Sequence, residues 1–276
     1  MNGLEGVVGE RAIGKKGLLV VGVVALVALA GCSGLSGGNG EATPTETGPP
    51  EAATIVDETA SAIEEVESFQ MDGVWNSTVS SPNGERKSNA TVTTAIDRGA
   101  DRIEVNQTTE AIGQRITAKM FLVDGTVYRH NPQLAQQYDS EWVKVDASGN
   151  VSQLFRQNDE LMGHAAMLRN ASVTVNGTET VDDTEAYRLE LDVNKTAMEM
   201  FYGYDGTALN ITELSTTVWV DTETNRIVRA DGVMTQKTTM AGQTATTSID
   251  YDERFEYVDV SISLPEAADS AVSVDQ

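Results

Sequence analysis

Residues 185–193 read Glu-Ala-Tyr-Arg-Leu-Glu-Leu-Asp-Val. Apolar side chains from Tyr187 to Val193 alternate strictly with charged ones, which is the period of a β-strand with one buried and one solvent-facing side. Turn sequences such as Ser81-Pro82-Asn83-Gly84 separate further stretches of this kind, so the sequence predicts antiparallel meanders. The other predicted strands, which are rich in Thr, Val and Ile, are 69–80, 85–97, 102–109, 114–123, 127–130, 141–146, 171–175, 211–220, 226–235 and 243–257.

Three segments have helical periodicity instead. Residues 52–67 place Ile55, Thr59, Ile63 and Val66 on one face. Residues 151–169 form the most apolar predicted helix, and 195–204 form a short one. About ten antiparallel strands accumulate roughly 20° of twist per pair and therefore have to curl. We expect a mainly β fold, a single strongly curved antiparallel sheet forming a half-open barrel, with helices on its concave side and a cavity where those helices fill it incompletely.

The N-terminus has the features of an export signal. Arg11, Lys15 and Lys16 precede an uncharged run from residue 17 to 31, and the run ends in Leu29-Ala30-Gly31-Cys32. This order matches the lipobox of bacterial and archaeal lipoproteins, which implies that Cys32 is lipidated and becomes the first mature residue. An uncleaved anchor helix is the alternative, and it places the protein at the same membrane face.

Three parts of the chain follow from this interpretation. Residues 1–31 are the signal peptide, 32–50 are a flexible tether rich in Gly, Ser, Thr and Pro, and 51–276 are one β domain. We expect a lipid-anchored monomer at the extracellular face of the cell membrane.

Composition excludes several classes of protein. Asp and Glu number 42 against 19 Lys plus Arg, a formal net charge of −23, and a nucleic-acid binder needs a cationic face instead. One cysteine can form neither a disulfide scaffold nor a thiolate zinc site. The negative charges on so acidic a surface repel one another less at molar salt, where the screening length is about 3 Å. The composition therefore favours a protein from a halophile over an ordinary acidic secreted protein.

Eight Asn-x-Ser/Thr sequences support an extracellular location, although a Thr-rich composition is the alternative explanation. The possible glycosylation sites are Asn76, Asn89, Asn106, Asn150, Asn170, Asn176, Asn194 and Asn210.

The lipobox, tether, first amphipathic helix and two meanders together resemble the LolA/LppX-type lipoprotein carrier superfamily. Residues 123–129 with Glu141-Trp142-Val143, and residues 218–221 with 226–229, are similar to stretches of haloarchaeal lipoproteins of that architecture. The resemblance implies a half-open barrel capped by helices that binds a lipid or other apolar molecule in its concave groove. It supplies no catalytic residues.

The residues themselves indicate no enzyme, cofactor or metal site. His130 and His164 are the only histidines, and we interpret both as structural. Residues 221–225 imitate the start of a calcium loop, but Arg226 stands where that loop needs Gly, so a hairpin turn explains them better. The pair Asp182-Asp183 is likewise interpreted as a solvated turn.

We therefore favour a non-enzymatic lipoprotein that binds or carries a hydrophobic, lipid-like ligand. The rivals are a glycosylated structural or interaction protein of the cell envelope with a filled core and, third, an envelope hydrolase. Flexible thioethers adapt to irregular ligands, which makes the methionines of the mid-chain helices candidates for the groove. The predicted groove residues are Leu154, Phe155, Leu161, Met162, Met167, Met198 and Phe201.

Overall fold

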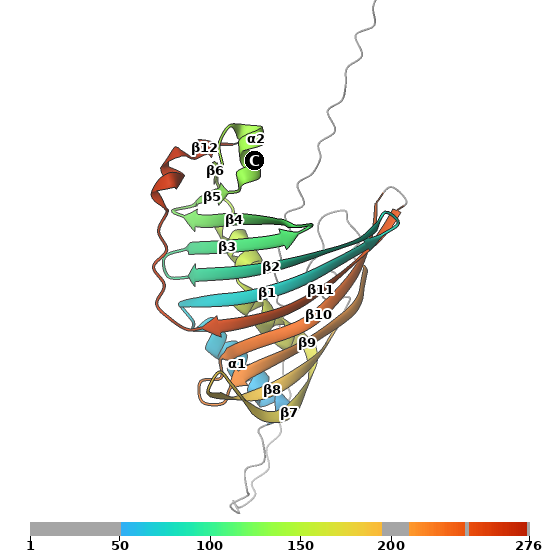
Figure 1. Cartoon of the computed structure of the whole chain (residues 1–276). Helices are drawn as coiled ribbons and strands as arrows, with labels where there is room; N and C mark the ends of the chain where they lie inside the picture. The colour runs from blue at the N-terminus through green and yellow to red at the C-terminus, as the bar shows by residue number, and fades with distance from the viewer. Residues whose placement is uncertain (1–50, 195–209, 241–242, 275–276) are drawn as a thin grey trace, which may run out of the picture.

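The computed structural model describes residues 51–194, 210–240 and 243–274, and these form one large sheet with a few helices behind it (Figure 1). The twelve strands lie in the order β12-β6-β5-β4-β3-β2-β1-β11-β10-β9-β8-β7. Neighbours are antiparallel except β12 and β6, which pair in parallel. The strands are β1 (Ser68–Ser81), β2 (Gly84–Asp97), β3 (Arg102–Ala111), β4 (Gln114–Val123), β5 (Thr126–His130), β6 (Trp142–Asp146), β7 (Ala171–Val181), β8 (Thr184–Val193), β9 (Asn210–Asp221), β10 (Ile227–Met240), β11 (Gln243–Glu256) and β12 (Val272–Ser273).

The predicted fold class is confirmed, because a single, mainly antiparallel sheet carries most of the described chain. Each predicted strand is present. The chain closes the centre of the sheet by pairing β1 with β11, so the two meanders join along strands that are far apart in sequence. The pair Asp182-Asp183 does form the β7–β8 turn, with positive φ at both residues.

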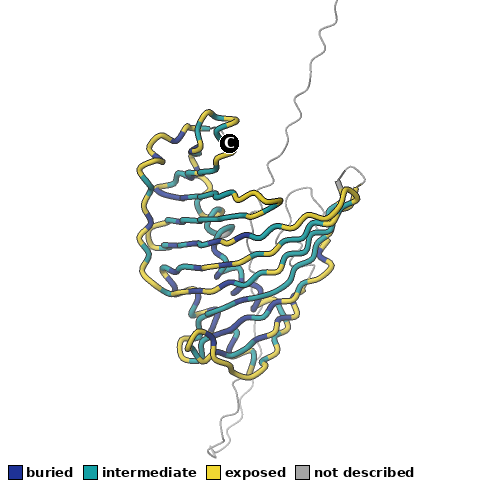
Figure 2. Tube along the Cα trace, in the orientation of Figure 1, coloured by how far each residue is buried: buried dark blue, intermediate teal, exposed yellow. Residues whose placement is uncertain are grey.

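The sheet has an inner face, which carries the helices, and an outer face (Figure 1). Helix α1 (Ala52–Glu64) buries Ile55 and Ile63 against this inner face, where β1 contributes Phe69 and Met71. Buried residues concentrate toward the α1 end of the strands, whereas the opposite ends, at the β1–β2 and β3–β4 turns, are mostly half-buried or exposed (Figure 2).

The single helix expected over 151–169 is wrong, because two helices form there. Helix α3 (Val151–Asn158) ends before Asp159, whose φ of −94° and ψ of 83° are not helical, and α4 (Glu160–Asn170) begins directly after it. The Asp159 side chain accepts a hydrogen bond from the Met162 amide, so it caps the new helix. The break also lets Asp159 point at Arg98, which lies beneath the junction.

Two further segments differ from the expectation. Strand β7 continues to Val181 rather than stopping at 175, because a bulge between Val175 and Thr178 absorbs Gly177, whose φ is 84°. Between β5 and β6 the chain adds η1 (Pro132–Leu134) and α2 (Ala135–Tyr138). After β11 the chain runs through η2 (Glu266–Ser270) to β12, and its apolar residues pack on Phe121 and Trp142.

Candidate functional site

The inner face of the sheet carries the candidate site, next to α3 and α4. Strand register decides which side chains point there: Trp75 on β1 lies opposite Tyr251 on β11, and Tyr251 lies opposite Gly232 on β10. Glu253 binds both Trp75 and His164 of α4, which fixes this set of residues on the helix side of the sheet.

Apolar side chains on this face are only partly buried where they adjoin the fully packed core. Leu154 and Phe155 on α3 and Met162 on α4 are half-buried, as predicted groove residues would be. The half-buried strand residues that pack against the same core include Trp75, Val105, Met120, Leu214 and Met234. Sequence reasoning missed this strand contribution, because period two alone does not say which face of a strand meets a helix.

The remaining predicted groove residues divide into two groups. Leu161 and Met167 are buried within the core rather than half-exposed at its edge. Met198 and Phe201 lie outside the described residues, as does Cys32. The role of all seven as ligand contacts stays a prediction.

A buried polar cluster joins α4 to the sheet beside these apolar residues. His164, only 4% exposed, places Nε2 2.7 Å from Oε2 of Glu253, which is 5% exposed. The other carboxylate oxygen of Glu253 accepts a hydrogen bond from Trp75 Nε1 at 3.1 Å. His164 also packs edge-on against Phe255. The interpretation of His164 as a structural residue stays a prediction.

Glu160 adds a second carboxyl group to the cluster. It lies one helical turn before His164, and its Oε2 has no hydrogen-bond partner among the described residues. Burial, followed by the nearby Glu253 carboxylate, raises the pKa of Glu160 well above its usual value. Burial disfavours the charged carboxylate, so Glu160 binds its proton at a higher pH than an exposed glutamate does.

Arg98 holds the α3–α4 junction over this face. Its Nε and Nη2 donate to the two carboxylate oxygens of Asp159 at 2.8 and 3.0 Å. Its Nη1 donates at 2.7 Å to two carbonyl oxygens, that of Ile63 in the last turn of α1 and that of Val66 just after the helix. One guanidinium therefore ties α1, the sheet and the helix junction together.

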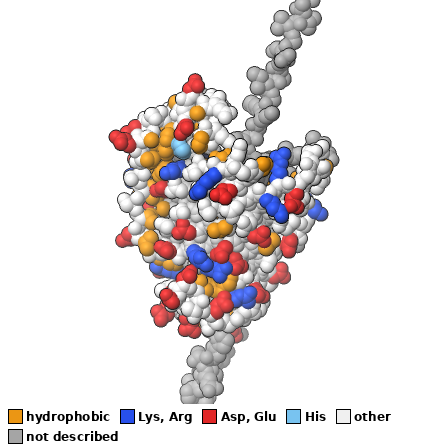
Figure 3. Space-filling model, in the orientation of Figure 1, with side chains coloured by type: hydrophobic (Ala, Val, Ile, Leu, Met, Phe, Trp, Pro, Cys, Tyr) orange, Lys and Arg blue, Asp and Glu red, His pale blue; other side chains and the backbone are white. Residues whose placement is uncertain are grey.

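The outer face carries many charged and polar side chains with apolar ones scattered among them (Figure 3). Two concavities lie on this face. The first, of about 790 Å³, crosses β2, β1, β11, β10 and β9 and includes Asp72, Asp231, Asp250 and Asp252. Arg229 binds both carboxylate oxygens of Asp252 and one of Asp231. The second concavity, of about 570 Å³, lies beside the β3–β4 turn.

The predicted glycosylation sites are mostly accessible. Asn76, on the outer face of β1, is exposed and accepts a hydrogen bond from Asn89 Nδ2, on the neighbouring strand. Asn89 and Asn106 are half-buried. The other exposed sites are Asn150, Asn170, Asn176, Asn194 and Asn210.

The described residues contain no group of three or more His, Cys, Asp or Glu side chains placed to hold a metal ion. Asp221 instead accepts hydrogen bonds from the amides of Glu223 and Thr224, so the calcium-like sequence is a hairpin turn, as interpreted. Across the same described ranges, no helix has the length and apolar character needed to span a membrane.

A family model described as a family of unknown function, DUF7537, matches residues 17–263. The chain belongs to this family. No curated protein matches it. Among solved structures, the chain is similar to LprF from Mycobacterium bovis. The two share 12% identity over 80% of this chain and 98% of LprF, with a TM-score of 0.44. The chain is also similar to the lipoprotein LppX from Mycobacterium tuberculosis, with 13% identity over 73% and 94% of the two chains and a TM-score of 0.41.

Proposed function

We propose that this DUF7537 protein is non-enzymatic and is lipid-anchored at the extracellular face of the cell membrane. It holds an apolar, lipid-like ligand against the inner face of its sheet. The observation that supports it is the half-buried apolar surface formed by α3, α4 and five strands, next to a fully packed core. Soluble proteins seldom leave contiguous apolar surface exposed without a binding partner.

Burial of apolar area would supply the binding energy. A ligand that hides 200–300 Å² of apolar surface gains about 5–8 kcal/mol before association costs, at about 25 cal/mol per Å². Met120, Met162 and Met234 suit this role, because an unbranched thioether adapts its shape to chains of different length.

Anchoring rests on the sequence alone. Cleavage before Cys32 and lipidation of its thiol would attach the protein to the membrane, and residues 33–50 would then serve as a tether between the lipid and the sheet domain. The predicted glycosylation of exposed asparagines fits the same extracellular location.

Trp75 offers an intrinsic probe of the inner face. Replacing Trp142 and Trp219, the only other tryptophans, with Phe leaves Trp75 as the sole tryptophan. We expect a stearic acid that carries a nitroxide on its chain to quench Trp75 fluorescence saturably, and unlabelled fatty acid to reverse the quenching.

Neighbouring residues on β10 provide a matched pair of variants. Met234 faces inward and Val233 faces outward, so Met234→Asp should weaken binding about tenfold or more while Val233→Asp leaves it unchanged. Absence of saturable quenching in the folded protein would contradict the proposal and favour the alternative, an envelope protein whose interior is filled by its own side chains.

A further inference from the structure

The turn between β3 and β4 presents a large apolar side chain to solvent. Ala111 pairs with Gln114, so Ile112 and Gly113 are the two central residues of the turn. Ile112 is 78% exposed, and of the large apolar side chains described as exposed it is the most exposed by a wide margin.

Ile112 is also conformationally strained. Its φ is 52° and that of Gly113 is 72°, so both residues are in the left-handed region that a two-residue turn of this type requires. Asn-Gly or Gly-Gly meets this requirement at little cost, whereas a β-branched residue is a marked outlier there. Neither burial nor turn geometry therefore stabilises the fold through an isoleucine at this position.

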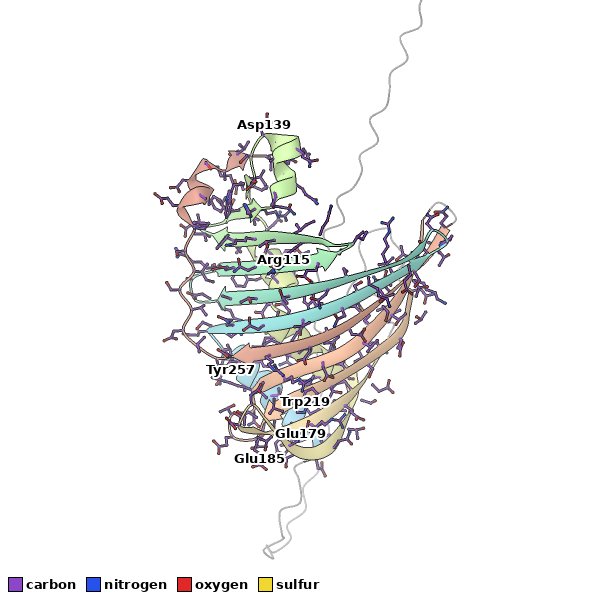
Figure 4. The ribbon with its side chains drawn as sticks, in the orientation of Figure 1. Arg115, Asp139, Glu179, Glu185, Trp219 and Tyr257 are labelled. Carbon is purple, nitrogen blue, oxygen red and sulfur yellow. The ribbon has the colours of Figure 1, made fainter. Side chains whose placement is uncertain are left out.

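The charge around this turn has the opposite sign to that of the chain. Residues 77–92 and 105–120, which form the two neighbouring hairpins, carry four basic and two acidic side chains, a net charge of +2 in a chain of −23. Lys87 and Arg115 line the outer-face concavity of about 570 Å³ beside the turn (Figure 4 labels Arg115). Glu85 lies 3.3 Å from Lys87 and Glu110 lies 3.9 Å from Arg115; all four side chains are more than half exposed, so these ion pairs are weak and leave both basic groups accessible.

We propose that the β3–β4 turn docks on a lipid bilayer that carries anionic headgroups. Ile112 inserts among the acyl chains at the interface, while Lys87 and Arg115 face the phosphate groups, and the adjacent concavity gives a headgroup room to approach. Apolar insertion and attraction to anionic lipid act together in interfacial membrane binding. This docking does not depend on ligand binding at the inner face. It would orient the protein so that the end of the sheet with the β3–β4 turn faces the membrane.

The experiment places a fluorescent reporter beside Ile112 without removing it. In the full chain with Cys32→Ser, Gln114→Cys is labelled with an environment-sensitive NBD group, and Glu223→Cys is the control at the other end of the strands, in the β9–β10 turn. Vesicles contain either phosphatidylcholine alone or a mixture with phosphatidylglycerol, in about 0.1 M salt, where charges act over about 10 Å. Because the reporter is local, membrane attachment through residues 1–31 does not imitate the signal.

We expect the emission at Gln114 to increase several-fold and shift to the blue with phosphatidylglycerol vesicles, and to change much less with phosphatidylcholine alone. The Glu223 reporter should not respond. Ile112→Leu should keep the response. Ile112→Asn should abolish it without lowering Tm, because it creates the Asn-Gly pair that the turn prefers. Arg115→Glu should reduce the response to anionic vesicles.

Several outcomes would overturn the proposal. These are an unchanged signal at Gln114, an equal signal with Ile112→Asn, or a shift that appears without vesicles and grows with protein concentration, which would indicate a second copy of the chain at this turn. Loss of fatty-acid quenching at Trp75 would leave the docking result untouched, so the two proposals fail separately.

Discussion

Arg98 gives the sharpest test of how the helices are held on the sheet. Its side chain is 19% exposed and that of Asp159 is 5% exposed, and the guanidinium makes two charge-assisted hydrogen bonds to this carboxylate. Arg98→Met keeps the length of the aliphatic stem but leaves the Asp159 charge buried without its partner.

Breaking a buried pair in this way costs about 3–5 kcal/mol. Because 1 kcal/mol shifts the Tm of a domain of this size by about 2–4 °C, we expect Arg98→Met to lower Tm by about 6–20 °C. The carbonyl oxygens of Ile63 and Val66 lose their donor in the same variant, which adds to the loss. Urea unfolding followed by circular dichroism would measure the change in free energy of unfolding.

A double-mutant cycle separates the ion pair from the carbonyl contacts. Asp159→Asn keeps a side-chain oxygen that can cap α4 through the Met162 amide, but it removes the charge. The double variant should therefore be more stable than the two single losses added together predict, by about 2 kcal/mol or more. A loss below about 1 kcal/mol for Arg98→Met, with additive effects in the double variant, would refute the view that this pair holds the α3–α4 junction.

Two further substitutions test the interior. The raised pKa of Glu160 means that the folded protein holds a proton that the unfolded chain releases near pH 4.5, so stability should fall as pH rises from there through the folded pKa. Glu160→Gln should remove that decline, and identical pH profiles of urea midpoints for the two proteins would contradict it. Gly232→Ala should destabilise strongly, by about 3 kcal/mol or more, since the new Cβ would lie 2.3 Å from the backbone oxygen of Ser215 and 2.7 Å from Tyr251 Oη. An unchanged thermal midpoint for this variant would show that β9 and β10 are not packed as described.

The strands could be predicted from sequence because period-two alternation directly reflects a sheet with one buried face. Residues 185–193 illustrate this, since their alternation reappears as the alternating burial of β8. The break at Asp159 could have been found as well, because an Asp before Glu160 is a typical helix N-cap. The partner of Asp159 could not, because Arg98 is 61 residues away and only the folded sheet brings the two together.

The candidate site was predictable only in part for the same reason. Helical spacing identified Leu154, Phe155 and Met162, whereas the strand residues of the inner face depend on which side of the sheet the helices cover. The Glu253–His164 contact joins residues 89 positions apart, and neither residue has a local sequence pattern that indicates a partner. Local periodicity therefore predicts burial well and long-range polar contacts poorly.

In a single sheet with helices on one face, groups other than helices have to shield the apolar side chains of the other face from water. Here Arg229 lies over the ring of Trp219 at 4.6 Å while it binds Asp252, and the Trp219 indole donates to Glu179 (Figure 4). The segment after β11 covers the other large outer aromatics, Phe121 and Trp142. These contacts shield the large aromatic side chains of the outer face, although Val74 on that face is 42% exposed. On the inner face, the apolar side chains beside α3 and α4 are half-buried. Four aspartates line the larger outer concavity, so we expect an apolar ligand to bind at the inner face instead.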